Sequence, residues 1–260
     1  MAFKSSSAEK PEIQGLQYHT RLKAGDIPPY VLVPGDPKRV AKIAQLWDKA
    51  EEVADYRQYV TYKGEYKGAK LTATSSGIGS PGLAIAFDEL LCVGVHTFIR
   101  VGTCGSLQPD MAIGDLVITT GAVRLDGASK DYVIPEYPAV AHYQVVEALI
   151  KAAKIHKVKY HVGITASTDT FTVGQGRPAF NDYLPSHKAN IFEDMQKAGV
   201  KNFEMEAGCL LTLANLFSVR AGAICVVIAD RVHNEFKITD EMEQSAALVA
   251  SEAVRLLQRK

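Results

Sequence analysis

The chain has 260 residues, 47% of them hydrophobic, and its 29 Lys and Arg residues balance its 29 Asp and Glu residues. A balanced charge argues against a nucleic-acid-binding surface. A chain of this length buries about 75% of the surface that it exposes when unfolded, which is enough for one large domain. Because residues 1–14 are polar, we expect a flexible N-terminal arm there and a single domain over residues 15–260.

The ends of the chain and its cysteines indicate a cytoplasmic protein. Residues 1–14 lack the apolar stretch of a secretory signal, and no segment reaches the length of a membrane span. The cysteines show neither a C-x-x-C pair nor metal-ligand spacing, so we expect reduced, buried thiols and no metal site. They are Cys92, Cys104, Cys209 and Cys225.

Apolar runs typical of strands alternate with segments of helical periodicity. The first unit is a strand at 30–33, a tight loop, and apolar residues at helical spacing as far as Trp47. Further strands are expected at 70–76, 97–101, 115–123, 160–166 and 222–228, and further helices at 83–91, 139–156, 206–217 and 240–258. This alternation predicts an α/β layer fold.

The turn that follows the first predicted strand is a candidate anion site. Gly35 allows backbone N–H groups to turn toward a ligand, and Arg39 adds positive charge in the first helical turn. A plain turn with Pro37 at the start of the helix explains the same residues equally well.

An arginine stands in the apolar strand at 97–101. Arg100 is costly to bury without a partner, and the small residues after it leave room for a ligand that Thr103 can contact. The alternative is an internal salt bridge to a core carboxylate.

Two carboxylates flank Met205. If the chain is extended there, Glu204 and Glu206 share a face, and a carboxylate at a pocket edge can accept hydrogen bonds from two vicinal hydroxyls of a ribose. Alternatively, Glu206 caps the helix that follows and complements its dipole. The spacing alone favours the cap.

Two further segments carry polar groups suited to a nucleobase. The irregular loop at 172–189 contains Gln175 and Arg177, which together can read the edge of uracil, although a solvated polar loop is the simpler interpretation. Asp230 follows a predicted strand at its carboxyl end and could protonate a leaving base, or pair with Arg231, or hold a loop.

Read together, these segments resemble the uridine phosphorylases in the hexameric branch of the nucleoside phosphorylase family, from about Leu16 to the C-terminus. The resemblance is carried by Val33-Pro34-Gly35-Asp36-Pro37-Lys38-Arg39-Val40, Ser76-Gly77-Ile78-Gly79, Arg100-Val101-Gly102-Thr103, Val123-Arg124-Leu125-Asp126-Gly127-Ala128-Ser129 and Glu204-Met205-Glu206. It implies a single-domain, three-layer α/β/α fold with a mixed, partly barrel-like central sheet.

The resemblance also implies site residues. The phosphate-binding residues would be Gly35, Arg39, Arg57, Arg100 and Thr103. The ribose-binding residues would be His19, Thr103, Met205 and Glu206. The base-binding residues would be Phe171, Gln175 and Arg177. His19 and Arg57, for which nothing local indicates a role, would enter the site of a neighbouring subunit, so the resemblance implies a homo-oligomer, usually a hexamer of three dimers.

The implied reaction is phosphorolysis of uridine to uracil and ribose 1-phosphate. Inorganic phosphate would be a co-substrate, and no organic cofactor, nucleic acid or membrane would be involved. Arg100, Arg177, Glu206 and Asp230 would be the catalytic residues, with Arg177 and Gln175 stabilising negative charge on the departing base.

Two departures from the family pattern keep alternatives open. Gln58 stands where many bacterial members have a glutamate that helps bind a monovalent cation, which weakens the case for such a cation. Asp230 matches an aspartate that purine nucleoside phosphorylases use on the purine ring, so inosine or guanosine phosphorolysis remains an alternative. A hydrolytic nucleosidase and a non-catalytic nucleoside-binding protein are further alternatives.

Overall fold

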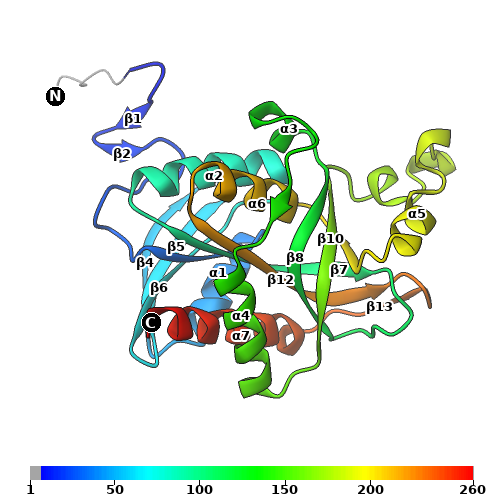
Figure 1. Cartoon of the computed structure of the whole chain (residues 1–260). Helices are drawn as coiled ribbons and strands as arrows, with labels where there is room; N and C mark the ends of the chain where they lie inside the picture. The colour runs from blue at the N-terminus through cyan, green and yellow to red at the C-terminus, as the bar shows by residue number, and fades with distance from the viewer. Residues whose placement is uncertain (1–6, 260) are drawn as a thin grey trace.

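The structure is a computed structural model that describes residues 7–259 (Figure 1). Residues 1–6 of the predicted N-terminal arm lie outside the described residues. At the end of the predicted arm, strand β1 (Glu12–Ile13) pairs antiparallel with β2 (Leu16–Gln17), which follows the arm. Gln14 and Gly15, both with positive φ, form the turn between them.

The remaining described strands form one mixed sheet. Its order is β13-β12-β8-β10-β11-β7-β3-β6-β5-β4, with β9 on the side of β8. The strands are β3 (Tyr30–Val33), β4 (Lys49–Tyr56), β5 (Tyr59–Tyr66), β6 (Ala69–Thr74), β7 (Thr97–Ser106), β8 (Leu116–Leu125), β9 (Ala139–Val140), β10 (Tyr160–Thr168), β11 (Asn202–Glu204), β12 (Arg220–Asp230) and β13 (Glu235–Phe236).

Part of this sheet closes into a barrel. Strand β12 pairs with β8 and also with β7, so β12, β8, β10, β11 and β7 form a ring. Pairing within the ring is mixed, because β12 runs parallel to β7 whereas β11 runs antiparallel to it. The mixed, partly barrel-like sheet expected from the resemblance is therefore confirmed.

Helices cover the sheet on two sides (Figure 1). They are α1 (Pro37–Ala44), α2 (Ser80–Cys92), α3 (Ala128–Tyr132), α4 (Tyr143–His156), α5 (Ile191–Lys197), α6 (Ala207–Leu216) and α7 (Asp240–Gln258). Helices α1, α4 and α7 share one hydrophobic core with the sheet, and α2 and α6 share another. Cys104, Cys209 and Cys225 are buried as expected, but the expectation was wrong for Cys92, which is exposed at the end of α2. None of the helices in residues 7–259 is long and apolar enough to cross a membrane.

Strand β7 belongs to both cores because its side chains alternate between the two faces. Ile99 and Val101 pack in the core of α1, α4 and α7, whereas Phe98 packs in that of α2 and α6. A strand covered on both faces is apolar almost throughout, which is why its sequence reads as a continuous buried run. The charged Arg100 is the exception in this run.

Several predicted boundaries were wrong, and three of these errors have a clear tertiary cause. Strand β7 continues to Ser106 instead of ending at residue 101, because residues 102–106 pair with β12 in the barrel. Helix α4 begins at Tyr143 instead of residue 139, because Ala139–Val140 pairs with β8. Helix α1 ends at Ala44, and Trp47 packs in the core outside it, donating from Nε1 to the Ser251 hydroxyl at 3.0 Å.

Candidate active site

A pocket of about 660 Å³ opens where several strands end. Its walls come from the loops after β3, β10, β11 and β12, and from the later half of β7. Ten of the predicted site residues line it: Gly35, Arg39, Arg100, Thr103, Phe171, Gln175, Arg177, Met205, Glu206 and Asp230. A second cleft of about 900 Å³, between residues 25–30 and the β4–β5 hairpin, contains none of them.

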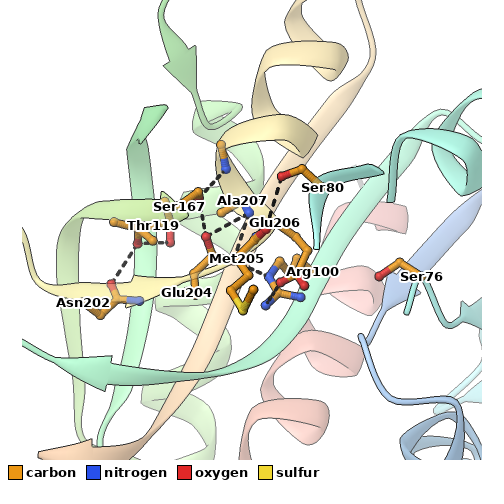
Figure 2. A network of polar contacts seen from close by, with 12 residues as sticks. Ser76, Ser80, Arg100, Thr119, Ser167, Asn202, Glu204, Met205, Glu206 and Ala207 are labelled. Atoms are coloured by element: carbon orange, nitrogen blue, oxygen red, sulfur yellow. Dashed lines mark hydrogen bonds and ion pairs between the residues drawn. The ribbon is translucent and has the colours of Figure 1, made fainter. Parts of the chain in front are cut away.

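Arg100 lies at the wall of the pocket between two carboxylates (Figure 2). Its side chain is 6% exposed, its Nε donates to Glu204 Oε2 at 2.6 Å, and its Nη2 is paired with Glu206 Oε2. Burial alone would lower the pKa of Arg100, but the two carboxylates outweigh burial and raise it. The salt bridge and the pocket position therefore occur together, although the sequence presented them as alternatives.

Glu206 does not cap helix α6. It is the residue directly before the helix, but its side chain makes no capping hydrogen bond. Its Oε1 instead accepts from the backbone N–H of Gly79 at 2.5 Å, in a loop where Gly79 has a φ of +94°. Burial, with Glu204 beside it, raises the pKa of Glu206 despite the opposing charge of Arg100. Glu206 thus lines the pocket with Gly79 and Arg100 as the partners of its two carboxylate oxygens.

Glu204 is the residue that caps helix α6. Its carboxylate accepts from the backbone N–H of Glu206 at 2.8 Å and from that of Ala207 at 2.9 and 3.0 Å. The cap predicted for this segment therefore exists, but it belongs to the other glutamate.

The loop after β3 is both a turn that starts a helix and part of the pocket wall, the two possibilities that its sequence left open. Asp36 caps helix α1 by accepting from the Lys38 N–H at 2.9 Å, with Pro37 at the first helical position. Gly35 lies so close to the loop after β6 that a Cβ there would be 3.3 Å from the Gly77 carbonyl oxygen. Arg39 lines the pocket while its Nε and Nη2 contact Glu243 Oε1 at 3.1 and 2.5 Å.

The end of the pocket away from Arg100 holds Phe171, Gln175 and Arg177, since a Cβ on Gly105, five residues further along β7, would be 3.5 Å from Arg177 Nη2. Gln175 is buried, and its Nε2 donates to the Thr168 hydroxyl at 3.2 Å while its Oε1 accepts from Arg177. The Arg177 guanidinium lies 4.3 Å from the centre of the Phe171 ring. Burial, followed by repulsion from Arg231, lowers the pKa of Arg177 to about 10.

Arg231 lines the same end of the pocket, although the sequence suggested for it only a pairing with Asp230. Its Nη1 donates to the Gln175 carbonyl oxygen at 2.9 Å, and its guanidinium carbon lies 5.0 Å from the centre of the Phe192 ring. Among residues 7–259, neither Arg177 nor Arg231 has a carboxylate partner. Two uncompensated positive charges favour a ligand that carries or develops negative charge there. The sequence feature that could have identified Arg231 is its position directly after the carboxyl end of strand β12.

Asp230 holds a turn and does not pair with Arg231. Its carboxylate accepts from the backbone N–H groups of Val232 and His233, each at 3.0 Å, and lies 2.8 Å from His233 Nδ1. Burial would raise the pKa of Asp230, but these hydrogen bonds outweigh burial and lower it, and Asp230 in turn raises the pKa of His233. Asp230 is therefore ionised at neutral pH, which disfavours the role of a proton donor.

Residues 29–259 match the model of the phosphorylase superfamily. The chain belongs to this superfamily. Among similar proteins is a uridine phosphorylase from Thermococcus kodakarensis, 55% identical over 99% of this chain and 92% of its own. A uridine phosphorylase from Escherichia coli is 40% identical, over 92% and 97% respectively. A guanosine phosphorylase from Halorubrum lacusprofundi is 39% identical, over 92% and 95%.

Two residues that the resemblance to this family assigned to the site do not line the pocket of their own subunit. His19 is bound by Glu89, which lies 2.8 Å from its Nδ1 and accepts its backbone N–H at 2.9 Å. Arg57 is exposed at the tip of the β4–β5 hairpin and donates to the Tyr18 hydroxyl at 3.3 Å. Both therefore lie together beside Tyr18, away from the pocket.

Arg124 and Gln58, which the comparison with the family pattern singled out, contact other parts of the protein and do not line the pocket. Arg124 is buried, and its guanidinium donates to the Ser129 hydroxyl and to backbone carbonyl oxygens, including those of Ile134 and Tyr137 at 2.7 Å. Gln58 lies against the glycine loop after β6, where a Cβ on Gly77 would be 2.8 Å from its Cγ. The described part of the chain contains no cluster of three or more His, Cys, Asp or Glu residues that could hold a metal ion.

Proposed function

We propose that this chain cleaves uridine with inorganic phosphate and releases uracil and ribose 1-phosphate. The observation that carries the proposal is one pocket with three kinds of polar group. Arg100 provides positive charge at one end, Glu206 lies next to it, and Gln175 with Arg177 lies at the other end. Similarity to uridine phosphorylases over nearly the whole chain supports the same substrate.

The phosphate is assigned to the end formed by Gly35, Arg39, Arg100 and Thr103. Arg100 donates to carboxylates through Nε and Nη2, and within residues 7–259 its Nη1 has no acceptor. An arginine fork with free N–H groups in a pocket suits a tetrahedral oxyanion. The Thr103 hydroxyl lies on the same strand and would reach a phosphate or sugar oxygen.

The ribose is assigned to Met205 and Glu206, between the two ends. Glu206 would accept hydrogen bonds from ribose hydroxyls and so hold C1′ in line with the phosphate. As the glycosidic bond lengthens, positive charge develops on the ribose, and the phosphate anion then attacks C1′ from the opposite side. The bonding electrons leave with the base.

The departing uracil is assigned to Phe171, Gln175 and Arg177, with Arg231 as an additional residue. Negative charge grows on the uracil ring as the bond breaks, and the two guanidiniums are placed to stabilise it. A well-placed donor of this kind commonly lowers the activation free energy by about 3–4 kcal/mol. Gln175 would read the base edge through its amide.

A nucleoside panel tests the reaction class and the substrate together. Purified protein is supplied with uridine, 2′-deoxyuridine, thymidine, inosine or guanosine, with and without inorganic phosphate, and released base and ribose 1-phosphate are measured. We expect phosphate-dependent turnover that is fastest with a pyrimidine nucleoside. Turnover without phosphate would indicate a nucleosidase, and faster cleavage of inosine or guanosine would overturn the assignment of uridine.

A purine nucleoside is the second candidate substrate, because a guanosine phosphorylase is among the similar proteins and Asp230 lines the pocket. The contacts of Asp230 argue against this candidate. Its carboxylate is already engaged by two backbone N–H groups and by His233.

We infer a dimer-based hexamer in which His19 and Arg57 complete the site of a neighbouring subunit. Their position outside the pocket of their own subunit supports this assignment. We expect sedimentation of the purified protein to give the mass of a hexamer, and the variants His19→Ala and Arg57→Ala to lose activity without unfolding. An active monomer would contradict the proposal.

A further inference from the structure

Glu204 is a fully buried carboxylate at the end of strand β11 (Figure 2). Its Oε2 accepts from Arg100 Nε at 2.6 Å, from the Glu206 N–H at 2.8 Å and from the Ala207 N–H at 2.9 Å. Its Oε1 accepts from the Ala207 N–H at 3.0 Å and from the Ser167 hydroxyl. Glu204 is among the residues that line the pocket, but its side chain is 0% exposed and both of its carboxylate oxygens are engaged by these donors.

Ser167 connects this carboxylate to two more elements. Ser167 lies on β10 as the register partner of Glu204 on β11, and its hydroxyl oxygen accepts from the Gly208 N–H of helix α6 at 2.7 Å. The same hydroxyl donates to Glu204. The carboxylate is therefore fixed by the barrel and by the first turn of α6, and it cannot rotate without breaking several hydrogen bonds.

The orientation of Arg100 depends on Glu204. A guanidinium is planar, so an acceptor at Nε and another at Nη2 determine the direction of its remaining N–H groups. Glu204 supplies the acceptor at Nε and Glu206 the one at Nη2. Of these two, only Glu206 is assigned to a substrate, so Glu204 alone can hold Arg100 while Glu206 exchanges contacts with a ribose.

We propose that Glu204, held by Ser167, is the positioning residue that keeps the Arg100 guanidinium directed at the phosphate. The proposal rests on the proposed phosphorolysis. It differs from a purely structural role as the cap of helix α6, because a cap would affect stability without preference for one substrate.

The test measures phosphate binding directly. Inorganic phosphate is titrated calorimetrically into the wild type, Glu204→Gln and Ser167→Ala, and KM for phosphate and for uridine is measured for each. A hydrogen bond to a charged group contributes about 1.5–3 kcal/mol, so we expect Glu204→Gln to weaken phosphate binding about 10-fold or more. Its KM for phosphate should rise more than its KM for uridine. Ser167→Ala should act in the same direction with a smaller effect.

Two matched variants separate positioning from general damage. Glu252→Gln removes another buried carboxylate, which is paired with Arg255 and lies outside the pocket. Thr165→Val removes a hydroxyl from the same strand as Ser167, bonded to Thr119 and Asn202. Both are expected to lower the melting temperature while leaving phosphate binding unchanged.

Each outcome decides one question. Unchanged phosphate binding in folded Glu204→Gln and Ser167→Ala would overturn the positioning role, as would equal increases in both KM values. If Glu204→Gln does not fold, the phosphate titration of Ser167→Ala decides. A wild type that binds no phosphate, or that binds it and does not cleave uridine, would instead refute the proposed function.

Discussion

Replacing Arg100 with methionine is expected to abolish measurable phosphorolysis and to lower the free energy of unfolding by about 3–5 kcal/mol. The substitution keeps an unbranched side chain but leaves Glu204 and Glu206 buried without their cation. It also removes the arginine assigned to the phosphate. Steady-state rates and urea unfolding measure the two effects, and activity within tenfold of the wild type would refute the assigned role.

The stability loss in Arg100→Met should depend on pH with a definite sign. Burial already raises the pKa of Glu206 above its ordinary value of 4.5, and loss of the guanidinium removes the charge that opposes this rise. A carboxyl group whose pKa is higher in the folded state destabilises the protein as pH rises and it must ionise. The deficit in unfolding free energy should therefore be larger at about pH 8 than at about pH 5.

Arg124→Met provides the control for this pH dependence. Arg124 is also a buried arginine, but its guanidinium donates to hydroxyl and carbonyl oxygens. Its loss should destabilise the protein without the same increase in the deficit toward alkaline pH. A similar pH slope in both variants would show that the carboxylates around Arg100 are not its cause.

Arg177→Ala is expected to lower kcat/KM for uridine about 100- to 1000-fold. Its guanidinium lies over Phe171, bonds Gln175, and is placed to stabilise charge on the leaving uracil. Turnover of a purine nucleoside should be affected much less. Rates with uridine and guanosine, measured on the same preparations, give the comparison.

Asp230→Asn is the matched comparison for Arg177→Ala, because it alters the same end of the pocket through the residue that suggested purine activity. We expect a modest effect on uridine turnover, since the Asp230 carboxylate holds a turn. A strong loss in Asp230→Asn together with tolerance of Arg177→Ala would reverse the assignment in favour of a purine substrate.

Much of the fold was predictable because local signals agreed with the tertiary structure. The α/β alternation came from apolar runs and helical spacing, and helix α7 occupies the predicted residues 240–258. The hairpin of β4 and β5 was missed, because most of β4 is exposed and carries no apolar run. The extension of β7 past residue 101 was missed because glycines and small residues there are permitted by barrel pairing, which a local pattern cannot show.

The sequence by itself determined the polar groups of the candidate site. Residue type and position made Arg100 a candidate, whereas Glu206, Gln175 and Arg177 were assigned to the site only through the resemblance to a known family; all four line the pocket. Residue type was enough for Arg100, since a charge inside an apolar segment requires a partner or a ligand.

Only the tertiary structure decided how these groups are paired. The hydrogen bonds that assign the helix cap to Glu204, join it to Arg100 and commit Asp230 to a turn depend on distances between side chains. That Arg231 lines the pocket near Arg177 was also evident only from the tertiary structure. Hydrogen bonds and ion pairs act over a few ångströms, and residues as far apart in sequence as Arg100 and Glu204 reach that distance only when the barrel closes.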